Sequence, residues 1–151
     1  MKKQVLKAAT MFVGIIALAF VSALAVSAQN PRNLVVNIPF DFTVKGKTLP
    51  AGEYIISRTS TIDEMSLTMQ RKDGEGNAIV LTKPINSEER QSESRLVFHR
   101  YGERYFLSQV WTSGDALGRE LYKTRQEQSL ETELAKNNSQ SETVTLVASA
   151  R

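Results

Sequence analysis

The chain has 151 residues, a length typical of one domain. It carries 19 lysine and arginine side chains and 16 aspartate and glutamate side chains, but residues 1–28 hold three of the lysines and no acid. Residues 29–151 therefore balance 16 cationic against 16 acidic side chains, which excludes a polybasic protein that binds nucleic acid by counterion release. The absence of cysteine excludes a disulfide framework, a Cys-based zinc site and a thiol nucleophile.

Residues 1–28 have the pattern of a secretory signal peptide. Three lysines lie within the first seven residues, and residues 8–28 carry no charge and end in small side chains. This pattern predicts cleavage after Ala28, a mature chain that begins at Gln29, and a location in the periplasm or outside the cell. An uncleaved anchor is the alternative, because 21 uncharged residues are just enough to span a hydrocarbon core of about 30 Å. Polar and small residues within the segment favour cleavage, which leaves no integral membrane span.

Residues 34–44 alternate between apolar and polar side chains. Every even position is apolar, and the odd positions include Asn37, Pro39 and Asp41. A period of two predicts a strand with one buried face. Because proline cannot donate a ladder hydrogen bond, Pro39 is expected to place this strand at a sheet edge or to bend it.

Six further strands are predicted from runs of strand-forming residues between turns. They cover residues 53–58, 64–71, 78–83, 95–101, 104–112 and 143–148. We interpret Lys45-Gly46-Lys47 as a turn, Pro84 as the end of the strand at 78–83, and residues 86–94 as an exposed polar loop.

The most specific local prediction is a hairpin across residues 95–111. A two-residue loop, Gly102-Glu103, suits a type II′ turn. The resulting register gives the cross-strand pairs Tyr101–Arg104, His99–Phe106 and Phe98–Leu107. It also puts Trp111 on the same face as Phe98 and Leu107. Both faces are partly apolar, so we expect central strands covered on both sides.

A short helix is predicted near the end of the chain. Thr124 and Glu127 have the spacing of a capping box, and the helix is expected to run to about Lys136. Only Leu130 and Leu134 give it an apolar stripe, so we expect it to lie on the surface. The predicted fold is all-β and mainly antiparallel, a small β-sandwich or partly closed β-barrel with one short C-terminal surface helix, within a single domain at 29–151.

Several segments together resemble a known protein family. They are Asn37–Val44, Leu49–Tyr54, Leu96–Gly102, Tyr105–Trp111 and Gly118–Leu121. In these segments the chain is similar to a family of small exported proteins of unknown function that are abundant in acidobacterial soil organisms. The resemblance extends over nearly all of residues 29–151 and implies a single exported β-rich domain. It implies no activity, cofactor or catalytic residue.

The sequence contains no clear catalytic cluster. His99 is the only histidine, and its place within the hairpin favours a packing role over a general base or a metal ligand. Asp73, Glu75 and Asn77 have the spacing of a calcium loop, but Ala78 takes the position that requires glycine, so we expect a solvated hairpin turn. We therefore predict no catalytic residue, no metal and no cofactor.

One set of residues is a candidate ligand face for a sugar or a small apolar molecule. It comprises Asp41, Tyr54, Tyr101, Tyr105 and Trp111. Core packing of the aromatic side chains, with solvation or ion pairing of Asp41, is the alternative. The sequence as a whole predicts an exported, non-enzymatic domain with a structural or interaction role in the cell envelope, whose partner is an envelope protein or a glycan. A module that binds a carbohydrate or a small apolar ligand is the second hypothesis, and a hydrolase is the third.

Overall fold

The computed structural model describes residues 33–58 and 65–150. The predicted signal peptide, its cleavage site and residue 64, the predicted start of the third strand, lie outside these ranges. Within them the chain forms ten strands and one helix. The strands are β1 (Leu34–Ile38), β2 (Phe42–Val44), β3 (Lys47–Leu49), β4 (Gly52–Arg58), β5 (Ser66–Arg71), β6 (Asn77–Asn86), β7 (Ser94–Tyr101), β8 (Arg104–Trp111), β9 (Leu117–Leu121) and β10 (Glu142–Ala150), and the helix is α2 (Arg125–Lys136).

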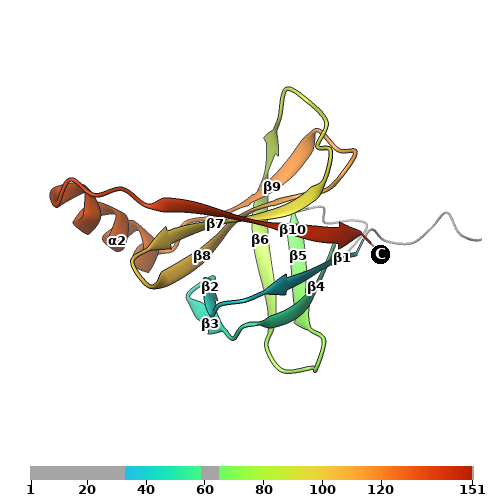
Figure 1. Ribbon diagram of the computed structural model, residues 1–151, viewed down its shortest axis with the longest axis horizontal. Helices are drawn as coiled ribbons and strands as arrows, with labels where there is room; N and C mark the ends of the chain where they lie inside the picture. Colours follow the sequence, from blue (N-terminus) through green and yellow to red (C-terminus); the bar gives the residue numbers. More distant parts are fainter. Residues whose placement is uncertain (1–32, 59–64, 151) are drawn as a thin grey trace, which may run out of the picture. The chain divides into compact units, whose positions relative to one another are not determined.

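Eight of the strands close into a barrel (Figure 1). Neighbouring strands follow the order β8-β7-β10-β1-β4-β5-β6-β9, all antiparallel, and β9 pairs back onto β8. The other two strands add to this ring, since β2 pairs in parallel with β8 and β3 pairs with β2. The predicted all-β, mainly antiparallel class with one short helix is confirmed, and the architecture is the barrel.

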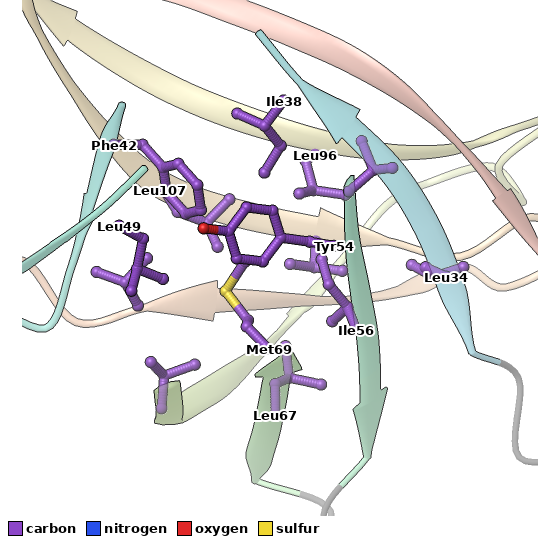
Figure 2. Close-up of a cluster of buried hydrophobic side chains, with 14 of the residues drawn as sticks. Leu34, Ile38, Phe42, Leu49, Tyr54, Ile56, Leu67, Met69, Leu96 and Leu107 are labelled. Carbon is purple, nitrogen blue, oxygen red and sulfur yellow. The ribbon is translucent and has the colours of Figure 1, made fainter. Parts of the chain in front are cut away.

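Side chains fill the interior of the barrel. Alternate residues of its strands form one cluster of buried apolar side chains, which β2 and β3 complete. Tyr54, Phe42 and Phe98 are among its largest members, and Figure 2 shows the Tyr54 ring between Phe42 and Met69. The Tyr54 hydroxyl donates a hydrogen bond of 2.7 Å to the Pro50 carbonyl, which satisfies its polar end. Because the chain has no cysteine, this core and the strand ladders hold the fold together.

The alternation at residues 34–44 is confirmed for burial, but the residues form two strands. The even positions of β1 and of β2 are buried, and the ladder is interrupted between Ile38 and Phe42. At the break, Asp41 Oδ1 accepts a hydrogen bond of 2.9 Å from the Ala51 amide. Pro39 lacks a ladder donor, so the chain bends here and passes from the barrel to the free side of β8.

Two short strands were not predicted. β3 begins at Lys47, because only Lys45 and Gly46 form the turn, with φ of +52° and +81°. β9 is centred on Gly118, Arg119 and Glu120, a composition that is unfavourable for a strand. It forms because it closes the barrel, with β6 on one side and β8 on the other.

The prediction that Pro84 ends its strand is wrong. β6 continues beyond it, and Pro84 lies opposite Arg119 of β9. β5 flanks β6 only as far as Leu81, and the Thr82 amide donates toward that side, to the Met65 carbonyl. Two residues later the Pro84 nitrogen faces the same side, beyond the end of β5, where the ladder requires no donor.

The predicted hairpin is confirmed from its turn as far as Phe98. The pairs are Tyr101–Arg104, His99–Phe106 and Phe98–Leu107, and Gly102 has a φ of +63°. Phe98 and Leu107 belong to the core cluster, and Phe106 is buried on the opposite face. The strands are therefore covered on both sides, as expected.

A β-bulge in β8 changes which side chains face inward beyond this point. Ser108 has no partner on β7, so the register shifts by one residue. An inserted residue reverses the faces of the residues that follow it. Val110 therefore joins the core cluster while Trp111 lies outside it. The prediction that Trp111 shares a face with Phe98 and Leu107 is wrong.

Trp111 packs against Gly118 of β9. Its Nε1 donates a hydrogen bond of 3.0 Å to Gln109 Oε1, and Arg95 lies over its ring.

A Cβ on Gly118 would lie 2.6 Å from the Trp111 ring, so Gly118→Ala should lower the free energy of unfolding by about 1–3 kcal/mol. Urea denaturation measures this cost. The same substitution should cost clearly less in a Trp111→Leu background, and equal costs in both backgrounds would contradict the contact.

The predicted helix and its N-terminal cap are confirmed. The Thr124 hydroxyl accepts a hydrogen bond of 3.2 Å from the Glu127 amide. Leu130 and Leu134 are only half-buried, so the helix lies on the surface. The capping box is incomplete, because the Glu127 side chain turns toward the barrel and is the buried residue of the helix.

Candidate functional site

The five residues of the predicted ligand face occupy separate places in the fold. Tyr54 is fully buried at the centre of the barrel (Figure 2). Tyr105 is half-buried and stacks on another ring at the margin of the core, with centroids 3.8 Å apart. Asp41 is exposed at the bend between β1 and β2. Tyr101 and Trp111 are buried outside the core cluster, Tyr101 beside α2 and Trp111 against β9.

A polar cluster of His99, Tyr101 and Glu127 joins the helix to the barrel. Glu127 Oε1 lies 3.1 Å from His99 Nδ1 and 3.4 Å from the Tyr101 hydroxyl. Glu127 is only 4% exposed, whereas the His99 side chain is 22% exposed. A buried polar group left without a partner costs about 1–3 kcal/mol, and more when it is charged. The two contacts of Glu127 therefore hold α2 against β7.

Sequence reasoning singled out His99 and Tyr101 but missed Glu127. A capping box assigns this carboxylate to the helix N-terminus, whereas here it accepts from two side chains of β7. The weak apolar stripe of the helix was the sequence signal that could have indicated such a polar contact. A helix with only two half-buried leucines needs another contact to hold it in place.

Burial raises the pKa of Tyr101 to about 12, and the negative charge of Glu127 adds to the shift. Because this pKa lies above the ordinary value of 10.0, the folded state holds the phenol proton more tightly than the unfolded chain does. The resulting stabilisation is complete below pH 10 and is lost as the pH rises through 12.

In an ultraviolet absorbance titration, Tyr101→Phe should reduce the tyrosine ionisation step that appears at the highest pH. The exposed-site control Tyr122→Phe should leave that step in place, and the reverse pattern would contradict the burial of Tyr101.

An apolar pocket opens between the β2–β3 turn, the middle of β6 and the end of β9. It has a volume of about 250 Å³. Its lining consists of Val80, Leu81, Leu121 and Tyr122 with Lys45, Lys123 and Thr124. The Lys123 ammonium contacts both carboxylate oxygens of Glu131, at 2.7 and 2.8 Å, and Lys45 is exposed at its turn. The lining thus combines an apolar wall with the exposed cation Lys45 and with Lys123, whose charge is balanced by Glu131.

Exposed apolar side chains surround this pocket. Ile79 and Leu81 point away from the core along β6 and are 59% and 57% exposed, and Tyr122, just after β9, is 62% exposed. We call these three residues the β6 patch. Large apolar side chains gathered at the surface are typical of binding sites. The run at 78–82 is apolar on both faces, so sequence alone did not show which of its residues are exposed.

The turn with calcium-like spacing is held by protein groups. Asp73 forms an ion pair of 3.0 Å with Arg71, and its Oδ1 accepts a hydrogen bond of 3.1 Å from the Glu75 amide. The second contact closes an Asx turn within the β5–β6 hairpin. Among residues 33–58 and 65–150, no group of three or more histidine, aspartate or glutamate side chains is placed to hold a metal ion. In the same ranges no helix has the length and apolar character needed to cross a membrane.

Comparison with known proteins identifies no relative. The chain matches no protein-family model, no curated protein and no solved structure. Its function is therefore inferred from its own residues and their geometry.

Proposed function

We propose that this chain is an exported, non-enzymatic domain with a structural or interaction role in the cell envelope. The observation that carries the proposal is the contrast between a filled interior and an exposed β6 patch. Barrels that carry a ligand keep space inside, whereas here Tyr54, Phe42 and Phe98 occupy it. We therefore expect other molecules to bind to the outer surface of the barrel.

The contacts of the only histidine favour a non-enzymatic role. His99 Nδ1 is bound to Glu127, which in turn contacts Tyr101, so this cluster joins the helix to the barrel. A general base would in addition need a neighbouring space in which a substrate could lie. The pocket beside the β6 patch is lined by other residues, so His99 does not line it.

The proposal that the protein is exported rests on its first 28 residues, in which three lysines precede a long uncharged run. Intact-mass measurement on protein recovered from outside the cytoplasm should give a chain that begins at Gln29. A mass that includes residues 1–28 would show an anchored protein instead.

The tagged mature chain is used to capture binding partners from the envelope fraction of the source organism, and a glycan array is screened in parallel. Both experiments test the interaction role. We expect wild type to retain an envelope protein or a glycan, and an Ile79→Ser/Leu81→Ser variant to bind the same purified molecule about tenfold more weakly. Glu142→Gln is the control, because Glu142 is exposed on β10, which lies four strands away from β6 in either direction around the barrel. Equal binding by the patch variant would contradict the role of the β6 patch, and chemical conversion of the captured molecule would contradict a non-enzymatic domain.

A second candidate function, binding of a small apolar ligand, is favoured by the pocket beside the patch. Its apolar wall suits a short hydrocarbon chain, and the exposed Lys45 suits a carboxylate at the end of that chain, since Lys123 is already paired with Glu131. The chemistry therefore favours an amphipathic carboxylate.

Isothermal titration with octanoate tests this function. We expect saturable binding that Lys45→Gln weakens by about tenfold, because the substitution removes a charge-assisted contact. Lys72→Gln is the matched control, since Lys72 is paired with Glu53 and does not line the pocket. Ile79 is also absent from the lining, so its substitution should leave octanoate binding unchanged. Equal binding by Lys45→Gln and wild type would refute the ligand function.

A further inference from the structure

One edge of β10 is largely unpaired, because the barrel closes there through only two residue pairs. β7 pairs with β10 from Glu142 to Ala148, whereas β1 pairs with it only at Ser149 and Ala150. Figure 1 shows β1 turning away toward β2 while β10 continues beside β7 toward α2. In the described part of the chain, no strand pairs with the β1-facing edge of residues 142–148. A row of backbone donors and acceptors is therefore available there.

This edge lacks the features that normally protect an exposed strand. Residues 143–150 contain no charged residue and no proline, and the pairing with β7 is free of bulges. Free edges in natural proteins usually carry a lysine, a proline or a bulge that prevents pairing with another chain. Val144 and Leu146 pack against the core yet are only half-buried, and the residues that alternate with them are exposed. The edge is therefore suited to receive another strand.

We propose that β10 pairs in antiparallel fashion with β10 of a second copy of this chain. A two-fold axis through Thr145, the midpoint of the free segment, aligns all of residues 142–148 with the symmetry mate. The cross-strand pairs are then Thr145–Thr145, Val144–Leu146, Thr143–Val147 and Glu142–Ala148. Apolar side chains meet on the inner face, β-branched side chains meet on the outer face, and no like charges oppose each other.

The neighbouring registers fit less well. An axis through Val144 places Leu146 opposite the charged Glu142. An axis through Leu146 places Glu142 opposite Ala150, whose edge is already occupied by Leu34 of β1. The axis through Thr145 therefore gives the longest pairing without a mismatched charge.

A charge swap at the axis tests this dimer, with association measured by sedimentation equilibrium on the mature protein. Wild type should be dimeric. Thr145→Lys and Thr145→Glu each place like charges opposite each other and should weaken self-association by about tenfold or more. Mixing the two variants should restore a dimer, because Lys then faces Glu across the axis. Gln70→Lys adds a charge on β5, which is paired on both sides, and should remain dimeric.

Each other outcome overturns the proposal. A wild type that stays monomeric has no self-pairing edge, and in that case capture of a strand from a different protein would identify the occupant instead. A dimer that persists in both Thr145 variants forms through another surface. Far-ultraviolet circular dichroism shows whether the variants keep the wild-type fold. If the two folded variants associate no better together than alone, the two-fold axis does not pass through Thr145.

Discussion

Phe98→Ala should lower the free energy of unfolding by about 3–5 kcal/mol, the largest effect of any single truncation we expect. The Phe98 ring is fully buried. It packs edge-on against Phe40 and Phe42, with centroids 5.3 and 5.6 Å away, and pairs across the hairpin with Leu107. Several elements meet at this ring, so the surrounding structure cannot collapse into the cavity that truncation leaves.

Leu130→Ala is the matched comparison for this truncation. Leu130 is half-buried on α2, so its loss should cost only about 1–2 kcal/mol. Urea denaturation of the two variants gives the order directly. If Leu130→Ala proves the more damaging, α2 is a core element and the surface position of the helix is wrong.

Glu127→Ala should cost about 2–3 kcal/mol, although it removes a charged residue from a surface helix. The loss leaves His99 Nδ1 and the Tyr101 hydroxyl without the acceptor that they share. Glu127→Gln keeps one acceptor oxygen and should cost less. Detachment of α2 should also speed tryptic cleavage after Arg125, which can be followed by mass spectrometry.

Glu131→Ala is the control within the same helix. Its carboxylate is paired with Lys123 at the surface, where such a pair contributes about 0–1 kcal/mol. Urea denaturation should therefore rank Glu127→Ala well below Glu131→Ala in stability. Equal costs would mean that the buried contact to β7 does not hold the helix.

Local patterns of the sequence were sufficient to predict most of the strands. The alternation at 34–44 depends only on the two-residue period of a strand, and the Gly102-Glu103 loop alone sets the register from Tyr101 to Phe98. In both cases the deciding residues are neighbours along the chain.

The features that sequence did not reveal depend on contacts between distant segments. The composition of β9 is unfavourable for a strand, and β9 forms because it pairs with both β6 and β8. The bulge at Ser108 reverses Val110 and Trp111, yet no residue type in β8 marks where the extra residue lies. Pro84 is tolerated because β5 is shorter than β6, a fact about a different strand.

The candidate site follows the same division. Sequence reasoning named Tyr101 and His99, but the partner that joins them, Glu127, follows them by 26 and 28 residues and belongs to the helix. The β6 patch and the lysines of the pocket come from the β2–β3 turn, β6 and the end of β9. Only closure of the barrel brings these segments together.

Xenon binding followed by methyl NMR tests most directly whether the interior of the barrel is filled. Xenon enters empty apolar cavities and shifts the signals of the methyl groups that line them. Wild type should show no saturable shift at the buried methyls of Leu96 and Leu107, whereas Phe98→Ala, which opens a cavity beside them, should show one. A saturable shift of these methyls in wild type would contradict the filled barrel and the placing of function on its outer surface.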